Sequence, residues 1–200
     1  ISVMQFKEEA KIIMRNPEFK MENRLLLGSM DLEKGTVTIE GKEYQLNDTN
    51  FPTVNPSNPY ELTEEEQFVM DKIKFSFVNS EKLQEHIRFL YSAGSLYKKF
   101  NSNLMFHGCV PMSEGGTLKI VNLRGERVKG AEYFDAVDRA VREGYFNKPH
   151  SDEKRICMDL IWYLWCGEDS PVFGKKKMTT FERYFIDDKE SHKEISNPFY

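Results

Sequence analysis

The chain has 200 residues, of which 40% are hydrophobic and 30% are charged, a composition typical of globular proteins rather than of disordered or fibrous ones. Lys and Arg together number 28 and Asp and Glu 32, so the formal net charge is −4. A mildly acidic chain gives no electrostatic reason to expect a nucleic-acid partner or a membrane surface. No stretch of the sequence approaches the ~18 consecutive apolar residues of a membrane-spanning helix.

The first half of the chain has the residue patterns of helices, interrupted by one β-hairpin. Apolar residues recur at helical spacing up to Pro17, where a helix must stop because a residue before proline avoids the helical conformation. Thr63 and Glu66 have the spacing of a capping box, in which each side chain satisfies a backbone N–H at the start of a helix. The expected elements are helices at 1–15 and 22–30, hairpin strands at 36–39 and 43–46, a loop at 47–60, and helices at 63–78 and 80–94.

Strand patterns dominate the start of the second half. Two apolar and aromatic runs flank Asn101-Ser102-Asn103, which predicts a β-hairpin, and a second hairpin is expected around Gly125. Ser151 is a predicted N-cap. The expected elements are strands at 95–100, 104–110, 118–121 and 126–128, then helices at about 131–146, 151–165 and 178–186. The two halves together predict an α+β fold.

Both ends of the sequence lie within patterned segments. The chain begins at Ile1, inside a helical pattern and without an initiator Met, and it stops at the aromatic residues Phe199 and Tyr200. Natural termini are usually polar and frayed. We therefore expect an internal piece of a longer protein, with a processed N-terminus as the alternative.

The cysteines indicate the redox setting. Cys109, Cys157 and Cys166 form an odd set without CxxC spacing, which argues against a disulfide framework and against a zinc knuckle. We expect a reducing, cytoplasmic environment.

His107 is the main candidate for metal chemistry. It follows an apolar run that we expect to be a buried strand, and strand ends often direct ligands into a cleft. Imidazole binds Mn, Fe and Zn, and the following Gly108 permits a close approach of backbone or substrate. A core histidine hydrogen-bonded to the backbone is the alternative interpretation, and a single histidine does not decide between the two.

Basic residues near the end of the chain are candidates for binding phosphate. Lys175 and Arg183 are the two that we single out, because a phosphate dianion needs point charges or a guanidinium fork. A solvated charged face is the alternative for each of them. The sequence offers no residue that we would assign as a catalytic nucleophile, acid or base.

Longer motifs resemble one enzyme family. The stretch LMFHGCVPM at 104–112 is similar to the strand-His-Gly motif of metallophosphoesterases. Several further strings, in order along the whole chain, resemble class III (Firmicutes-type) fructose-1,6-bisphosphatases. Among them are LNDTNFPTV at 46–54, NPYELT at 58–63, HIRFLY at 86–91, WYLW at 162–165, FGK at 173–175 and TFERYF at 180–185.

The resemblance implies a two-metal phosphatase of which this chain holds one ligand. In the family this histidine, here His107, binds metal, while Asp-x-His, Gly-Asp-x-x-Asp-Arg and Gly-Asn-His motifs would precede Ile1 and a Gly-His motif would follow Tyr200. The implied cofactor is a pair of divalent ions, with Mn²⁺ suited to oxygen and imidazole ligands. The implied substrate is a sugar bisphosphate, fructose 1,6-bisphosphate, hydrolysed to fructose 6-phosphate and phosphate in gluconeogenesis.

The resemblance also implies a domain division and leaves rivals open. We expect residues 1–94 to form a mainly helical insertion with one hairpin, and 95–200 to form part of a metallophosphoesterase-type αββα core. One rival is a metallophosphoesterase acting on another phosphomonoester or on a phosphoprotein. The other is a non-catalytic regulatory or oligomerisation module, and a homo-oligomer is compatible with both. For these 200 residues alone we expect no useful catalysis.

Overall fold

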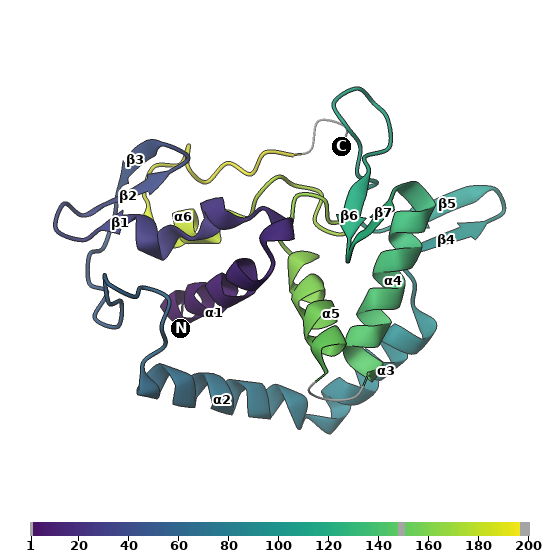
Figure 1. Ribbon diagram of the computed structural model, residues 1–200, viewed down its shortest axis with the longest axis horizontal. Helices are drawn as coiled ribbons and strands as arrows, with labels where there is room; N and C mark the ends of the chain where they lie inside the picture. Colours follow the sequence, from purple (N-terminus) through teal and green to yellow (C-terminus); the bar gives the residue numbers. More distant parts are fainter. Residues whose placement is uncertain (1, 148–150, 197–200) are drawn as a thin grey trace. The chain divides into compact units, whose positions relative to one another are not determined.

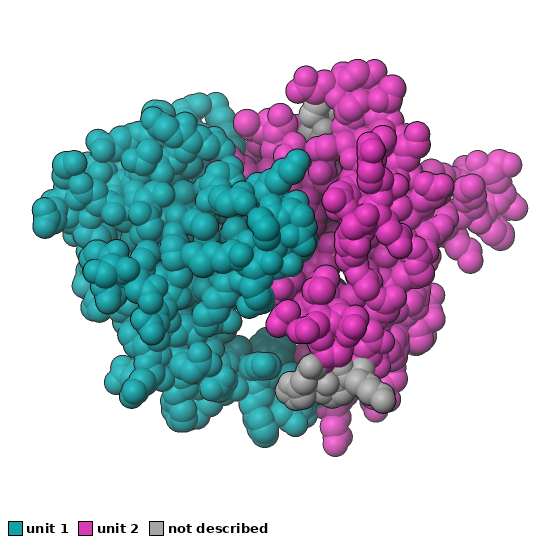
Figure 2. Space-filling model, in the orientation of Figure 1, with its two compact units in different colours: residues 1–80, 179–193 teal, residues 81–178, 194–200 magenta. Residues whose placement is uncertain are grey.

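The computed structural model describes residues 2–147 and 151–196, which fall into two compact units (Figures 1 and 2). The first unit comprises Ile1–Ser80 and Thr179–Lys193, and the second comprises Glu81–Met178 and Glu194–Tyr200. Both contain helices and small antiparallel sheets, so the predicted α+β class is confirmed. The division at residue 94 into an insertion and a catalytic core stays a prediction.

The first unit combines helices with an antiparallel sheet of strand order β1-β2-β3. The pairing of β2 with β3 sets Val37 opposite Tyr44, and β1 adds through Met30 opposite Val37. Its helices and strands are α1 (Ser2–Arg15), β1 (Met30–Asp31), β2 (Thr36–Ile39), β3 (Lys42–Gln45), α2 (Glu64–Val78) and α6 (Thr180–Phe185).

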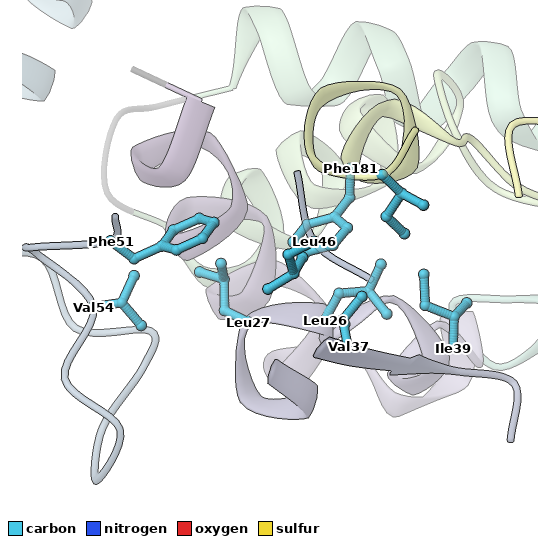
Figure 3. Close-up of a cluster of buried hydrophobic side chains, with 9 residues drawn as sticks. Leu26, Leu27, Val37, Ile39, Leu46, Phe51, Val54 and Phe181 are labelled. Carbon is cyan, nitrogen blue, oxygen red and sulfur yellow. The ribbon is translucent and has the colours of Figure 1, made fainter. Parts of the chain in front are cut away.

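The core of this unit joins segments from opposite ends of the sequence. Phe181 from α6 and Ile186 just after it are each 1% exposed, and Ile186 forms a β-bridge with Leu46. Phe6 of α1 packs edge to face on Phe181, with ring centroids 5.3 Å apart. The buried cluster, seen in Figure 3, consists of Leu26, Leu27, Val37, Ile39, Leu46, Phe51, Val54, Phe181 and Ile186.

Two buried ion pairs hold the unit together. Arg24 donates two parallel hydrogen bonds of 2.8 Å to the carboxylate of Glu182 in α6, the bidentate geometry that guanidinium favours. Lys7 is fully buried and donates to Glu66, at 2.7 Å, and to the carbonyl of Thr53, at 2.6 Å. Burial by itself raises the pKa of Glu66, but hydrogen bonds led by that from Lys7 lower it further, so the net pKa is below the usual value and the carboxylate stays charged.

The second unit is built on two packed helices with two β-hairpins. Helix α4 lies against α5, and Gly144 permits the contact because a Cβ there would come within 3.1 Å of the Cys157 Cβ. The buried side of α4 includes Tyr133, Phe134 and Val137. The elements of this unit are α3 (Glu81–Ala93), β4 (Tyr97–Phe100), β5 (Asn103–Phe106), β6 (Val121–Leu123), β7 (Glu126–Val128), α4 (Gly130–Phe146) and α5 (Asp152–Tyr163).

Local signals in the sequence produce the expected caps and turns. Thr63 and Glu66 form both hydrogen bonds of the capping box, and the hydroxyl of Ser151 accepts from the backbone of Lys154. Asn101 and Ser102, which connect β4 to β5, have φ values of 48° and 62°. Two consecutive residues with positive φ make a type I′ turn, whose twist matches that of the flanking strands.

Several predicted boundaries are wrong. Instead of a helix at 22–30 there are two 3₁₀ turns, Glu22–Arg24 and Leu26–Ser29, because Leu25 between them has a non-helical ψ of 61°. The strand predicted at 104–110 ends at Phe106, and the strand predicted at 118–121 begins only at Val121. Within the described part of the chain, no helix is both long and apolar enough to cross a membrane.

Removing the guanidinium of Arg24 should destabilise the first unit. In Arg24→Ala, the carboxyl group of Glu182, whose side chain is 1% exposed, loses its bidentate partner, so the free energy of unfolding should fall by about 3–5 kcal/mol. Urea denaturation measures this. Lys34→Ala removes a cation from a solvent-exposed pair with Asp31 and should leave the midpoint unchanged. Equal effects of the two substitutions would contradict a structural role for the buried pair.

Candidate functional site

His107 lies on the surface, directly after β5. The expectation that a buried strand would precede it is wrong: Leu104, Met105 and Phe106 are 52%, 51% and 42% exposed. Within the described residues β5 pairs only with β4, and a two-stranded ribbon cannot cover both of its own faces. His107 itself is exposed, and its ring has no hydrogen-bond or ion-pair partner among the described residues. The alternative of a hydrogen-bonded core histidine does not match this environment.

An apolar cavity lies against the strand that leads to His107. Its volume is about 350 Å³. Phe106 and Leu104 of β5 line it together with Tyr97 of β4, which share one face because Tyr97 pairs with Phe106 across the hairpin. Another part of the wall is formed by Leu118, which precedes β6, and by Phe134 of α4. The residue immediately before His107 is therefore only partly packed.

The turn after His107 packs closely against the backbone of Pro171 and Val172. A Cβ placed on Gly108 would lie 2.4 Å from the carbonyl oxygen of Pro171 and 2.6 Å from that of Val172. The amide of Cys109 donates a 2.9 Å hydrogen bond to the Pro171 carbonyl. Glycine is therefore required after the histidine by a close contact of two backbones.

Buried tyrosines hold the segment on which the turn rests. Tyr133 of α4 donates from its hydroxyl to the carbonyl of Asp169 at 2.7 Å, and the amide of Asp169 donates to the hydroxyl of Tyr163 at 3.1 Å. Burial raises the pKa of both phenols well above the usual value, with the neighbouring charge of Asp169 contributing. Both hydroxyls therefore stay protonated, and Tyr133 remains a donor at any physiological pH.

The two phosphate-binding candidates already have partners. Lys175, in the second unit, forms an ion pair with Glu194. Arg183, in the first unit, donates from Nε to the hydroxyl of Thr179 at 3.2 Å. Their phosphate-binding role stays a prediction.

The described residues do not form a metal site by themselves. Across 2–147 and 151–196 there is no group of three or more His, Cys, Asp or Glu side chains placed to hold a metal ion. His107 fits the role of a single accessible imidazole donor, and a single donor is insufficient for a stable centre. Any metal bound at His107 needs further ligands from outside these residues.

Sequence reasoning missed the residues that support His107. Asp169, Ser170 and Tyr133 lie between 26 and 63 positions away from it and belong to no motif that the sequence displays. Only Gly108 carried a signal, because a glycine after a strand suggests a close approach without saying what approaches.

Adding a methyl group at Gly108 should disturb this contact. Gly108→Ala forces the Cβ against two backbone carbonyls that cannot rotate away, so it should lower the free energy of unfolding by about 1–3 kcal/mol. Thermal denaturation measures the loss. Gly115→Ala is the matched control, because the nearest atom to its Cβ is 4.0 Å away. A neutral Gly108→Ala would show that the two segments separate easily.

Comparison with known proteins places the whole chain in one family. Relatives named "Fructose-1,6-bisphosphatase class 3" from Clostridium botulinum (strain Langeland / NCTC 10281 / Type F) and from Clostridium tetani (strain Massachusetts / E88) are 58% and 54% identical over 200 residues. The match covers 100% of this chain and 30% of each relative, so the chain spans about a third of the length of these curated proteins. No solved structure matches. The family model described as Firmicute fructose-1,6-bisphosphatase matches residues 1–200, and the chain belongs to that family.

Proposed function

We propose that residues 1–200 are part of a longer fructose-1,6-bisphosphatase and supply one ligand, His107, to its metal centre. The observation that carries the proposal is the match of the family model over the full chain, together with an exposed and unpartnered imidazole at a strand end. The reaction is the hydrolysis of fructose 1,6-bisphosphate to fructose 6-phosphate and phosphate. Two divalent ions, with Mn²⁺ as the proposed metal, would supply an activated hydroxide and stabilise the phosphate oxygens.

The role of His107 in this reaction is to hold metal rather than to move protons. A neutral imidazole offers one ring nitrogen to the metal, and the other is free to hydrogen-bond. The backbone contact of Gly108 fixes the turn that carries it. The described residues contain no group of three or more potential metal ligands, so we infer that the remaining ligands come from the rest of the longer protein.

The finer fold assignment belongs to the same proposal. Residues 95–200 would form part of a metallophosphoesterase-type αββα core and 1–94 a mainly helical insertion. The apolar residues exposed on both faces of the β4–β5 hairpin support this, because Phe100 and Met105 on one face and Leu104 and Phe106 on the other suit a strand pair inside a larger sheet.

The proposed setting is cytoplasmic, and the partner is a small sugar bisphosphate rather than a nucleic acid or a membrane. All three cysteines are free and buried, which suits a reducing compartment. A homo-oligomer remains a prediction. It is compatible with α2, where Phe68, Phe75 and Phe77 are 59%, 70% and 62% exposed, because large exposed apolar side chains that lie together often mark an interaction surface.

Loss of His107 should abolish activity through loss of metal. In the full-length protein, His107→Ala should lower kcat/KM for fructose 1,6-bisphosphate by about a hundredfold or more and reduce bound Mn²⁺. Phosphate release and metal content are the measurements. His86→Ala, at an exposed histidine of α3, is the control and should change neither. An active wild type with an unaffected His107→Ala would remove His107 from the site, and a wild type active only on another phosphomonoester would favour the rival phosphatase.

Of the two phosphate-binding candidates, we test Lys175, because the neighbouring Lys176 offers a matched control. If it holds the phosphate that is not hydrolysed, Lys175→Ala should raise KM by about tenfold with little change in kcat, since a hydrogen bond to a charged group is lost in substrate and transition state alike. The neighbouring Lys176→Ala, at a more exposed position, provides the control. An unchanged KM in Lys175→Ala would mean that its pair with Glu194 is only structural.

A further inference from the structure

Ser170 is fully buried and uses its whole hydrogen-bonding capacity on the backbone. Its hydroxyl donates to the carbonyl of Leu164 at 2.5 Å and accepts from the amides of Val172, at 3.0 Å, and Phe173, at 3.1 Å. It is 0% exposed. A serine hydroxyl has one donor and two acceptor positions, so none remains for solvent or substrate. This side chain therefore fixes the course of the backbone from Leu164 to Phe173.

The segment fixed by Ser170 is the one that carries the His107 turn. The thiol of Cys109 donates to the Ser170 carbonyl at 3.1 Å, and the amide of Cys109 donates to the Pro171 carbonyl at 2.9 Å. The carbonyls of Pro171 and Val172 are the atoms that exclude a side chain at Gly108. The position of the turn is thus set by the backbone that the Ser170 hydroxyl holds.

Three backbone groups depend on this hydroxyl for a hydrogen bond. Without it, the carbonyl of Leu164 and the amides of Val172 and Phe173 lose a buried partner, and each unsatisfied group favours a backbone shift that reaches water. Such a shift moves the Pro171 carbonyl and, through its hydrogen bond, the amide of Cys109. A displacement of this kind at a metal ligand weakens metal binding even when the ligand itself is intact.

We propose that Ser170 is a positioning residue for the metal centre, acting on His107 through the backbone of Pro171 and Val172. The inference rests on the proposed role of His107 as a metal ligand. It assigns a function to a buried serine that lies 63 positions away in the sequence and does not itself touch metal or substrate.

The test uses Mn²⁺ binding by the full-length protein. Ser170→Ala should weaken Mn²⁺ affinity by about 10- to 100-fold, as measured by titration with the free ion, and saturating Mn²⁺ should restore most of kcat. Ser191→Ala is the matched control: Ser191 is only 7% exposed and its hydroxyl also donates to a backbone carbonyl, that of Asp188, at 2.7 Å, but it lies in the first unit. The control should leave Mn²⁺ affinity unchanged.

A second variant keeps the test decisive if Ser170→Ala does not fold. Tyr133→Phe removes only the hydroxyl that holds the Asp169 carbonyl, next to Ser170, and retains the buried ring. It should weaken Mn²⁺ binding severalfold in the same direction, as expected for one lost hydrogen bond.

The results distinguish failure of the positioning role of Ser170 from failure of the ligand role of His107. If His107→Ala loses metal while folded Ser170→Ala and Tyr133→Phe bind Mn²⁺ as tightly as wild type, the positioning role is overturned and His107 remains a ligand. If His107→Ala binds the full complement of Mn²⁺ with unchanged affinity, the ligand role falls and the inference falls with it. A loss of affinity in Ser191→Ala equal to that in Ser170→Ala would also overturn the inference, since general destabilisation would explain both.

Discussion

The contact between two backbones at Gly108 is the constraint on which the candidate site depends. With a separation that leaves no room for a Cβ, the turn after β5 can take only one position against Pro171 and Val172. That position is useful only if the opposing segment is itself rigid. The hydroxyl of Ser170 hydrogen-bonds to the backbone of this segment. Tyr133 of α4 and Tyr163 of α5 hydrogen-bond to the backbone of Asp169. The packing of the two helices is thereby connected to an exposed histidine on a small hairpin.

In the first unit, too, contacts between residues distant in the sequence fix the position of a segment, here through a β-bridge and an ion pair. Residues separated by more than 130 positions meet where α6 returns to the β1-β2-β3 sheet, through the Leu46–Ile186 bridge and the bidentate pair of Arg24 with Glu182. Removal of one partner from a buried ion pair leaves the other group without its compensating charge. Here the direction of the guanidinium fork fixes α6 relative to the 3₁₀ turns at 22–29.

The sequence predicts local structure well where a short-range mechanism decides it. The capping box of Thr63 and Glu66 and the turn at Asn101-Ser102 depend on neighbouring residues only, and both form as expected. The helix expected at 22–30 failed because the ψ of Leu25 is set by packing of Leu26 and Leu27 into the core. The prediction that β5 is buried was wrong for another reason. An apolar sequence shows that a strand can be buried, but not which segment covers it, and β4 alone does not cover β5.

For the candidate site, the sequence indicates the proposed ligand but not the residues that support it. His107 followed by Gly108 is a local pattern, and its resemblance to a metallophosphoesterase motif names a role for it. Ser170 and Tyr133 could not be predicted, since their importance comes from contacts between segments that are 36–64 residues apart and carry no shared periodicity. The phosphate candidates Lys175 and Arg183 were chosen by charge, and charge alone does not show that each already has a protein partner.

The most direct measurement is anomalous X-ray scattering at the manganese edge from crystals of the full-length protein soaked in Mn²⁺. We expect a strong anomalous peak at coordination distance, roughly 2 Å, from a ring nitrogen of His107, with the other ligands supplied from outside residues 1–200. Gly108 should remain packed on the carbonyls of Pro171 and Val172. Manganese bound elsewhere, with the His107 ring free in solvent, would show that His107 is not a metal ligand.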